Sequence, residues 1–284
     1  MSALVAYRNW SDGVGTIPAW TFGYSLGYPD SLQEVAGYPA TNLRTRQLGN
    51  VARFERVGGG AVTGPCAIEL VASGAGFPVR LVTVIGQHLP DAVLYKPSGG
   101  SFVSVALISG YSPLLGIASQ GFAVVPPGTI VERVRLFWND IPFDYFELSR
   151  VSIADALDLT DGVNSTWSLG VEDPGILDAS AGRQWYSSPL PRTRRLSVAA
   201  STLDTMQAFG MSAEGVVSGS HPVPSIQDLQ MHAGSTGEIV VVPRVVPGVW
   251  AYRAGVYGHL DRPPVIRHRA GPYYETDLTV IEER

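Results

Sequence analysis

The sequence predicts an all-β fold of two β-sandwich or barrel domains, and three observations support this prediction. Short runs rich in β-branched and aromatic residues recur between turn signals along most of the chain. Gly and Pro are abundant, at 32 and 21 of 284 residues, which disfavours a helical bundle. Amphipathic helical patterns are few and short. Short strands at regular spacing are typical of antiparallel sandwiches and barrels.

The expected strands are apolar or alternating segments bounded by glycine-rich turns. In the segment 131–138, the polar residues Glu132, Arg133 and Arg135 interrupt the apolar ones, a pattern that indicates a strand with one solvated face. Gly58-Gly59-Gly60 lacks the Lys-Ser/Thr ending of a phosphate-binding loop, so it predicts a turn. The clearest expected strands are 67–71, 79–85, 102–108, 131–138 and 238–242.

Two short helices are expected in the second half of the chain. In the segment 201–209, Ser201 or Thr202 is the candidate N-cap, and Gly210 is the expected end. The other candidate helix spans residues 225–232. Each would have about two turns, so neither is stable without a sheet to pack against.

The expected organisation is an arm followed by two domains. Seven of the 27 aromatic residues fall within residues 1–40, among Gly and Pro, which predicts an aromatic-rich N-terminal arm over residues 1–36. A polar, turn-rich stretch near residues 155–165 predicts a domain boundary. We therefore expect a β-sandwich over residues 37–157 and a second β-rich domain over residues 158–284.

Composition limits the classes of partner. The net charge is −5, which disfavours a protein that holds nucleic acid by neutralising phosphates. The chain shows neither a signal-peptide pattern nor an apolar run near ~18 residues, so we expect a soluble protein without membrane insertion. Cys66 is the only cysteine, which excludes an intrachain disulfide and a multi-cysteine zinc site; its apolar neighbours predict a core position.

Four segments of the first half follow one another in a recognisable order. They are Tyr38-Pro39-Ala40-Thr41-Asn42-Leu43, Val82-Thr83-Val84-Ile85-Gly86-Gln87-His88-Leu89, Arg133-Val134-Arg135-Leu136-Phe137 and Tyr145-Phe146-Glu147-Leu148-Ser149-Arg150-Val151. This order resembles that of the discoidin-like, galactose-binding-like jelly-roll domains found in bacteriophage virion proteins. The resemblance covers about residues 37–157.

The second half contains a further set of segments with a known counterpart. They are Trp167 to Asp173, Arg192 to Val198, the expected helix 201–209, His221-Pro222-Val223-Pro224 and Val256 to Leu260. Their order resembles that of distal-tail and tail-tube-like β domains. Together the two resemblances imply a structural virion protein at the tail tip or baseplate of a tailed phage, made in the bacterial host cytoplasm. Its partners would be copies of itself and neighbouring tail proteins.

Aromatic and arginine side chains are the candidate assembly residues, because these types dominate protein interfaces. Trp20, Phe22 and Tyr24 alternate as one face of a strand would. The candidate interface residues are Trp20, Phe22, Tyr24, Tyr28, Arg194 and Arg195. The alternative function is a carbohydrate-binding adhesion module, which would contact host surface glycans through exposed aromatic residues in loops at one end of the sandwich.

The acidic residues indicate neither a metal site nor an enzyme. Asp155, Asp158 and Asp161 precede Gly162 and are weak candidates for calcium ligands, but their three-residue spacing favours a solvated interdomain turn over a calcium loop, so we expect no metal. The sequence has no nucleophile elbow, HExxH motif or dinucleotide fingerprint, so we expect no enzyme activity and no cofactor. Adjacent carboxylates such as Glu172-Asp173 point to opposite faces of a strand and give a glycosidase no support.

Overall fold

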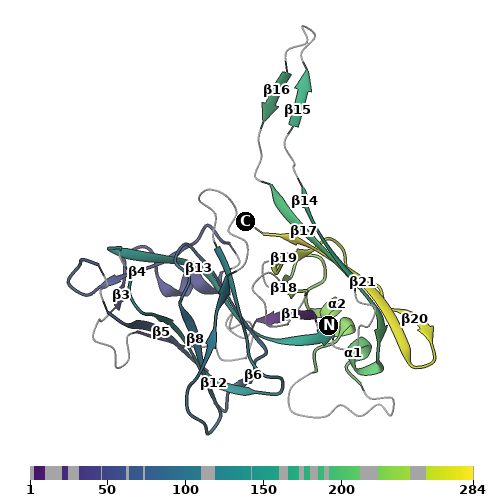
Figure 1. Cartoon of the computed structure of the whole chain (residues 1–284), viewed down its shortest axis with the longest axis horizontal. Helices are drawn as coiled ribbons and strands as arrows, with labels where there is room; N and C mark the ends of the chain where they lie inside the picture. The colour runs from purple at the N-terminus through teal and green to yellow at the C-terminus, as the bar shows by residue number, and fades with distance from the viewer. Residues whose placement is uncertain are drawn as a thin grey trace.

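The protein consists of two β-rich halves that lie side by side (Figure 1). The structure is a computed structural model, and it describes residues 3–9, 21–24, 32–45, 47–61, 64–72, 74–109, 119–141, 143–159, 166–172, 176–179, 185–188, 192–211, 223–243 and 254–283. Strand is the dominant element in both halves, so the all-β prediction is confirmed. None of the helices in these ranges has the length and apolar character needed to cross a membrane.

One antiparallel sheet of thirteen strands runs through both halves. Its main path is β10-β11-β7-β13-β1-β18-β19-β21-β17-β14; β20 adds to β21, β4 adds to β13, and β3 adds to β4. The strands are β1 (Ala3–Asn9), β3 (Leu32–Glu34), β4 (Ala52–Arg56), β7 (Leu81–Gly86), β10 (Ile108–Ser109), β11 (Ser119–Val124), β13 (Tyr145–Leu159), β14 (Thr166–Glu172), β17 (Thr193–Leu203), β18 (Glu238–Val242), β19 (Val256–Leu260), β20 (Arg267–Ala270) and β21 (Tyr273–Glu282).

A second sheet packs against the first-half strands and closes a β-sandwich. It has the order β2-β5-β12-β8-β9, with β6 beside β12. Its strands are β2 (Thr21–Tyr24), β5 (Cys66–Val71), β6 (Phe77–Pro78), β8 (Ala92–Pro97), β9 (Val103–Ala106) and β12 (Ile130–Trp138). The Phe146 ring lies 5.3 Å from that of Phe54 and 4.7 Å from that of Trp138, between centroids. Cys66 is buried in this core, as expected.

Strand β1 joins the two halves within the large sheet. It pairs with β13 on one side and with β18 on the other. Ala3, Val5 and Tyr7 face the core of the second half, whereas Leu4 and Ala6 face a third apolar cluster on the opposite side of the sheet. The described parts of the expected arm are therefore strands of the two sheets, and the expected boundary after residue 157 falls inside β13.

Two short α-helices cover the core of the second half. Helix α1 (Thr205–Phe209) begins later than expected, because the chain up to Leu203 continues β17. Neither Ser201 nor Thr202 is the cap: the Asp204 carboxylate accepts from the backbone N–H of Gln207, while the Gln207 side chain accepts from the backbone of Asp204. Gly210 ends the helix as expected, with a positive φ of 71°.

Helix α2 (Ile226–His232) confirms the second helical prediction. The Ser225 hydroxyl caps it by accepting from the backbone N–H of Asp228 at 3.1 Å. Ile226 and Leu229 are buried against the sheet. A 3-10 helix (η2, Ala40–Arg44) lies in the sandwich half and buries Leu43.

Buried polar groups connect the halves along a seam. Arg150 of β13 is fully buried; it pairs with Glu238 of β18 and donates to the Leu43 carbonyl oxygen at 3.1 Å. Arg194 of β17 donates to Glu282 of β21 at 2.9 Å, and Gln120 of β11 donates to the same carboxylate at 3.2 Å. We call this set the seam: Leu43, Gln120, Arg150, Arg194, Glu238 and Glu282.

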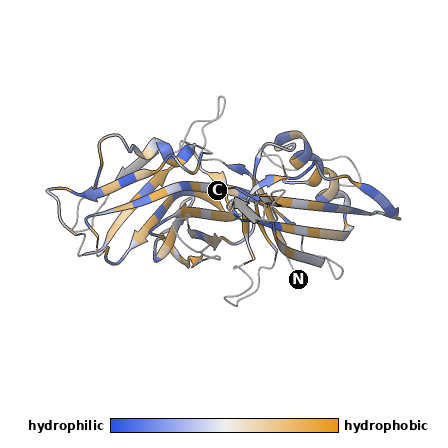
Figure 2. Cartoon of the chain, turned by 90° about the horizontal axis from the view of Figure 1, so that it is seen from above, coloured by the Kyte–Doolittle hydropathy of each residue, from blue (hydrophilic) through white to orange (hydrophobic). Residues whose placement is uncertain are grey.

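The far side of the second half carries a projecting hairpin. Strands β14 and β17 lead into β15 (Ile176–Ala179) and β16 (Trp185–Ser188), which pair with each other. Figure 1 shows this hairpin extending away from the body of the molecule. Seen from above, the two halves form an elongated molecule in which hydrophobic and hydrophilic residues alternate along many strands (Figure 2).

Candidate assembly surface

Strand β14 leaves one side of the large sheet open. Among the described residues, β14 pairs with β17 and with no other strand, so it ends the path of the sheet. The outer side of such a strand presents a row of backbone N–H and C=O groups that another strand can pair with. The position of β14 makes it a site for strand addition by a second chain.

The face of β14 that continues the core is apolar up to the edge. Trp167, Leu169 and Val171 share this face because side chains alternate along a strand. Trp167 packs against the core of the second half, and Leu169 lies opposite buried Leu196 of β17. Leu169 is 40% exposed and Val171 is 64% exposed. We call this exposed end of the stripe, with the free side of the strand, the β14 edge.

The β15–β16 hairpin beyond the β14 edge also has a side that no other described strand covers. The pairing of β15 with β16 extends from Ile176 opposite Ser188 to Ala179 opposite Trp185. No third strand joins them within the described ranges. A two-stranded ribbon gains little stability by itself in water. Contacts from a neighbouring chain would stabilise the hairpin more than they would stabilise a strand inside a sheet.

The opposite face of the β14–β17 pair is charged. Arg195 donates to Glu172 at 2.6 Å and to Asp261 at 2.5 Å, and its side chain is 38% exposed. The hydrogen bond to Glu172 is the main cause that raises the pKa of the Arg195 guanidinium. Arg195 is therefore accessible to a neighbour, as the sequence prediction requires, and its role at an interface stays a prediction.

Arg194 corrects the sequence prediction. Arg194 is only 3% exposed, and its guanidinium lies against Glu282 and Gln120 inside the molecule. Consecutive residues of β17 point to opposite faces, so Arg194 and Arg195 cannot share one surface. Arg194 belongs to the seam and is inaccessible to a neighbouring chain.

The aromatic candidates near the N-terminus are only partly described. Phe22 and Tyr24 belong to β2, the end strand of the six-stranded sheet, where they pair with Leu70 and Ile68 of β5. Trp20 and Tyr28 lie outside the described residues. Their assembly role stays a prediction.

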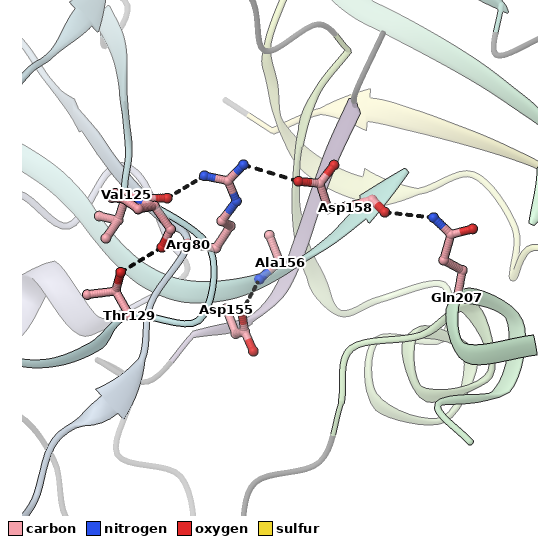
Figure 3. Close-up of polar contacts among 8 residues, drawn as sticks. Arg80, Val125, Thr129, Asp155, Ala156, Asp158 and Gln207 are labelled. Atoms are coloured by element: carbon pink, nitrogen blue, oxygen red, sulfur yellow. Dashed lines mark hydrogen bonds and ion pairs between the residues drawn. The ribbon is translucent and has the colours of Figure 1, made fainter. Parts of the chain in front are cut away.

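The acidic candidates do not converge where the structure describes them. Asp155 and Asp158 lie three residues apart on β13, which puts them on opposite faces of the strand (Figure 3). The Asp155 carboxylate accepts from the backbone N–H of Ala156 at 2.9 Å, and Arg80 donates to the Asp158 carboxylate at 3.1 Å. Asp161 lies outside the described residues.

Asp158 instead connects two parts of the molecule. Its carboxylate meets Arg80 of the sandwich half, and its backbone carbonyl accepts from the Gln207 side chain of α1 at 2.9 Å (Figure 3). In the described ranges, no group of three or more His, Cys, Asp or Glu side chains is arranged to hold a metal ion. A structural contact accounts for Asp158 without a metal.

The sequence analysis missed Leu169 and Val171. Their signal is the alternation of apolar residues at positions 167, 169 and 171. This pattern predicts a strand with one apolar face, but it does not tell whether that strand lies inside a sheet or at its end. The pairing of β14 with β17 alone makes the difference.

Comparisons with other proteins assign the chain to no family. No protein-family model matches it, and neither a curated protein nor a solved structure matches it.

Proposed function

We propose that the chain is a non-enzymatic structural component of a tailed-phage virion, at the tail tip or baseplate. It assembles with copies of itself and with tail neighbours through the β14 edge and the β15–β16 hairpin. The observation that carries this proposal is the exposed apolar pair Leu169 and Val171 on an open sheet end, at the base of a projecting hairpin. The sequence resemblances over residues 37–157 and in the second half support the tail context.

The β14 edge offers two kinds of contact to a neighbour. The backbone groups on its outer side, which no other described strand pairs with, can extend the sheet into the next chain, and this fixes the direction and register of the added strand. Leu169 and Val171 supply apolar area at the same place, and burial of apolar area is the main driving force for association. Exposed Arg195 lies on the other face of the same strands, where ion pairs can select the partner.

A projecting hairpin favours a ring or a stack over a closed pair. The hairpin extends from one side of the molecule (Figure 1), so a contact between hairpin and body joins two different surfaces. Head-to-tail contacts of this kind generate rings when the rotation closes and filaments when it does not. Both forms suit a component of a phage tail.

The experiment compares two exposed valines. Val171→Lys places a charge on the β14 edge, and Val57→Lys is the matched control, because Val57 is similarly exposed just after β4. We expect Val171→Lys to reduce the assembled fraction at least about tenfold in light scattering coupled to size exclusion. The control should assemble as the wild type does, and circular dichroism should show both variants folded.

A second measurement tests the tail context itself. A labelled copy of the chain should appear as density at the tail tip in electron micrographs of purified virions. Equal assembly of Val171→Lys and wild type would contradict the role of the β14 edge. Absence of the label from purified virions would contradict the virion location.

A further inference from the structure

Strand β20, labelled in Figure 1, forms a second open side of the large sheet. Within the described ranges, β20 pairs with β21 and with no other strand. Tyr274 of β21 pairs with Leu203 of β17 on one side and with His268 of β20 on the other. Because β14 lies beyond β17, the outer sides of β20 and β14 point in opposite directions across the sheet. We call the outer side of β20, over residues 267–270, the β20 edge.

Strand direction makes the two edges compatible. Neighbouring strands are antiparallel from β14 through β17 and β21 to β20. Strands β14 and β21 therefore run one way, and β17 and β20 run the other way. A second copy in the same orientation can place its β20 beside β14 as an antiparallel neighbour. Such a contact continues the pairing that the sheet already has, and the added copy does not have to be inverted.

The two faces of the sheet also match across this contact. Ile266 packs partly against the core of the second half, and the His268 ring lies 5.5 Å from the Tyr274 ring, between centroids. Arg267 points to the other face, where it pairs with Asp277 at 3.1 Å. When the faces are continuous, the core face of β20 meets the apolar stripe of the β14 edge. The arginine face of β20 then meets the charged face of the β14–β17 pair.

The charges on the two edges are complementary. On the β14–β17 pair, Glu172 and Asp261 share the single cation Arg195, so one negative charge is in excess. On β20, exposed Arg269 donates to the backbone carbonyl oxygen of Ser201 at 2.7 Å, and no carboxylate of the described residues pairs with it. The negative excess of one edge and the uncompensated guanidinium of the other therefore attract each other.

The same charges disfavour the pairing of β20 with a second β20. Arg267, His268 and Arg269 are all exposed, and such a pair would bring the guanidinium groups of both copies together. Charged side chains at a sheet edge discourage indiscriminate strand addition, and like charges opposed across two strands are unfavourable. The β20 edge therefore selects an acidic strand edge rather than a copy of itself.

We propose that the β20 edge of one copy adds to the β14 edge of the next, so that the copies assemble head to tail into one continuous sheet. This inference builds on the proposed function, because it names the partner that the β14 edge binds. Among all the strands of a second copy, β20 has the direction, the faces and the charge that this edge requires.

The two edges lie at different heights along the strands. Strand β20 pairs with residues 273–275 of β21, whereas Thr166 of β14 is aligned, through Ala199 of β17, with Asp277. Each added copy is therefore displaced along the strand direction, as strands are when a staggered sheet closes into a barrel. The expected assembly is a ring with tilted strands or, where the rotation does not close, a helical stack.

The test begins with two variants that each lose one edge. Val171→Lys places a charge on the β14 edge and leaves β20 intact, whereas Arg269→Glu reverses the charge on the β20 edge and leaves β14 intact. We expect each variant alone to lose at least about tenfold of the assembled fraction in light scattering coupled to size exclusion. Arg262→Glu is the matched control, because Arg262 is exposed but lies outside the strands, and it should assemble as the wild type does. Circular dichroism should show all three variants folded.

A one-to-one mixture of the two variants carries an intact β20 edge and an intact β14 edge on different copies. A head-to-tail contact therefore restores a complex of two chains, in which β20 of the Val171→Lys copy pairs with β14 of the Arg269→Glu copy. A contact between two β14 edges predicts the opposite result: Arg269→Glu alone assembles as the wild type does, and the mixture recruits no Val171→Lys copies. That result would overturn the inference.

Cross-linking checks the contact without changing its charge. Cys66 is the only cysteine of the chain and is buried, so the wild type should give little product with a bismaleimide reagent. Leu169→Cys and His268→Cys each add one exposed thiol, one on each edge. We expect a dimeric product from a mixture of these variants and much less from either alone. Product from Leu169→Cys alone, or no product from the mixture, would contradict the contact.

The inference and the proposed function fail on different results. If Val171→Lys assembles as the wild type does, the β14 edge has no assembly role, and both fail. If Val171→Lys disrupts assembly while Arg269→Glu does not, and the cysteine mixture gives no product, the β14 edge keeps its role and β20 is not its partner.

Discussion

The seam and the β14 edge belong to the same sheet, yet they place arginine side chains in opposite environments. At the seam, Arg150 and Arg194 are buried, and each faces a carboxylate from another strand. At the edge, Arg195 lies partly in solvent between Glu172 and Asp261. Neighbouring residues 194 and 195 of one strand thus take part in two different kinds of contact.

The buried and the exposed ion pairs differ in how much they stabilise the fold and in whether a partner can reach them. Breaking a buried ion pair leaves a charge in a medium that solvates it poorly, so the pair makes one arrangement of the two halves much better than others. An exposed pair competes with water and contributes little to stability, but it stays available to a partner. The seam therefore holds the halves together, and the edge remains free to select a neighbour.

The largest expected effect tests the seam directly. Glu238→Gln removes the carboxylate that faces the buried Arg150 guanidinium, and we expect it to lower the free energy of unfolding by about 3–5 kcal/mol. Glu172→Gln makes the same change at the edge, and we expect a loss of at most about 1 kcal/mol. Urea unfolding followed by circular dichroism measures both.

Similar losses in the two glutamine variants would remove the distinction between seam and edge. A paired replacement sharpens the test. Arg150→Met combined with Glu238→Leu removes both charges, so it should be more stable than Glu238→Gln alone if the uncompensated charge causes the loss.

The next comparison is between two glycines, whose replacement by alanine should change the free energy of unfolding in opposite directions. A Cβ at Gly258 of β19 would lie 1.8 Å from the carbonyl oxygen of Ile281, and that backbone belongs to the paired strand β21. At Gly170 of β14 the nearest atom would be 3.9 Å away. We expect Gly258→Ala to destabilise the protein by about 1–3 kcal/mol and Gly170→Ala to stabilise it by up to about 1 kcal/mol.

Thermal unfolding of these two variants checks the prediction. If Gly258→Ala is as stable as the wild type, β19 and β21 do not approach as closely as the structure shows. If Gly170→Ala is destabilised, the edge has contacts that the structure does not show.

Helix α1 is an intermediate case between seam and edge. Asp204 caps it from an exposed position, and the buried Gln207 side chain donates to the Asp158 carbonyl oxygen. We expect Asp204→Ala to cost about 1 kcal/mol, while Asp204→Asn, which retains the capping oxygen, should cost much less. Equal losses in the two variants in urea unfolding would mean that the carboxylate charge matters more than the cap.

The sequence predicted local structure well wherever that structure depends on interactions between residues close together in the chain. The apolar strand at 238–242 and the helix expected over residues 225–232 both follow from local signals, and both are confirmed. The first helix was placed too early because its cap signal, Asp204 followed by Gln207, comes directly after the end of a strand. Local patterns therefore predict the type of a secondary-structure element more reliably than they predict its boundaries.

The candidate sites depended on information that local patterns lack. Alternation shows that Arg194 and Arg195 face opposite ways, but only the pairing of β17 with β21 shows which one is buried. The same holds for Arg269, whose place on an open edge arises because β20 pairs with β21 alone among the described strands. Which strand ends the sheet is decided by contacts between distant segments, and a single sequence does not display them.

The smallest expected effect is a pH dependence of stability at the outer end of the sandwich. Burial lowers the pKa of His88 below 6.5, although the Glu147 charge acts in the opposite direction. Protonation also removes the lone pair with which Nδ1 accepts from the Glu147 backbone. The neutral ring therefore stabilises the fold above pH 6.5, and this contribution is lost as the pH falls below that value.

The measurement is the difference in Tm between wild type and His88→Gln at pH 8 and pH 5.5. The two proteins differ only at residue 88, so the change in this difference reports His88. We expect the wild type to lose about 1–2 °C more than the variant on acidification. An equal loss in both would show that His88 is as solvated in the folded chain as in the unfolded one. A larger loss in the variant would mean that the Glu147 charge, rather than burial, governs this ring.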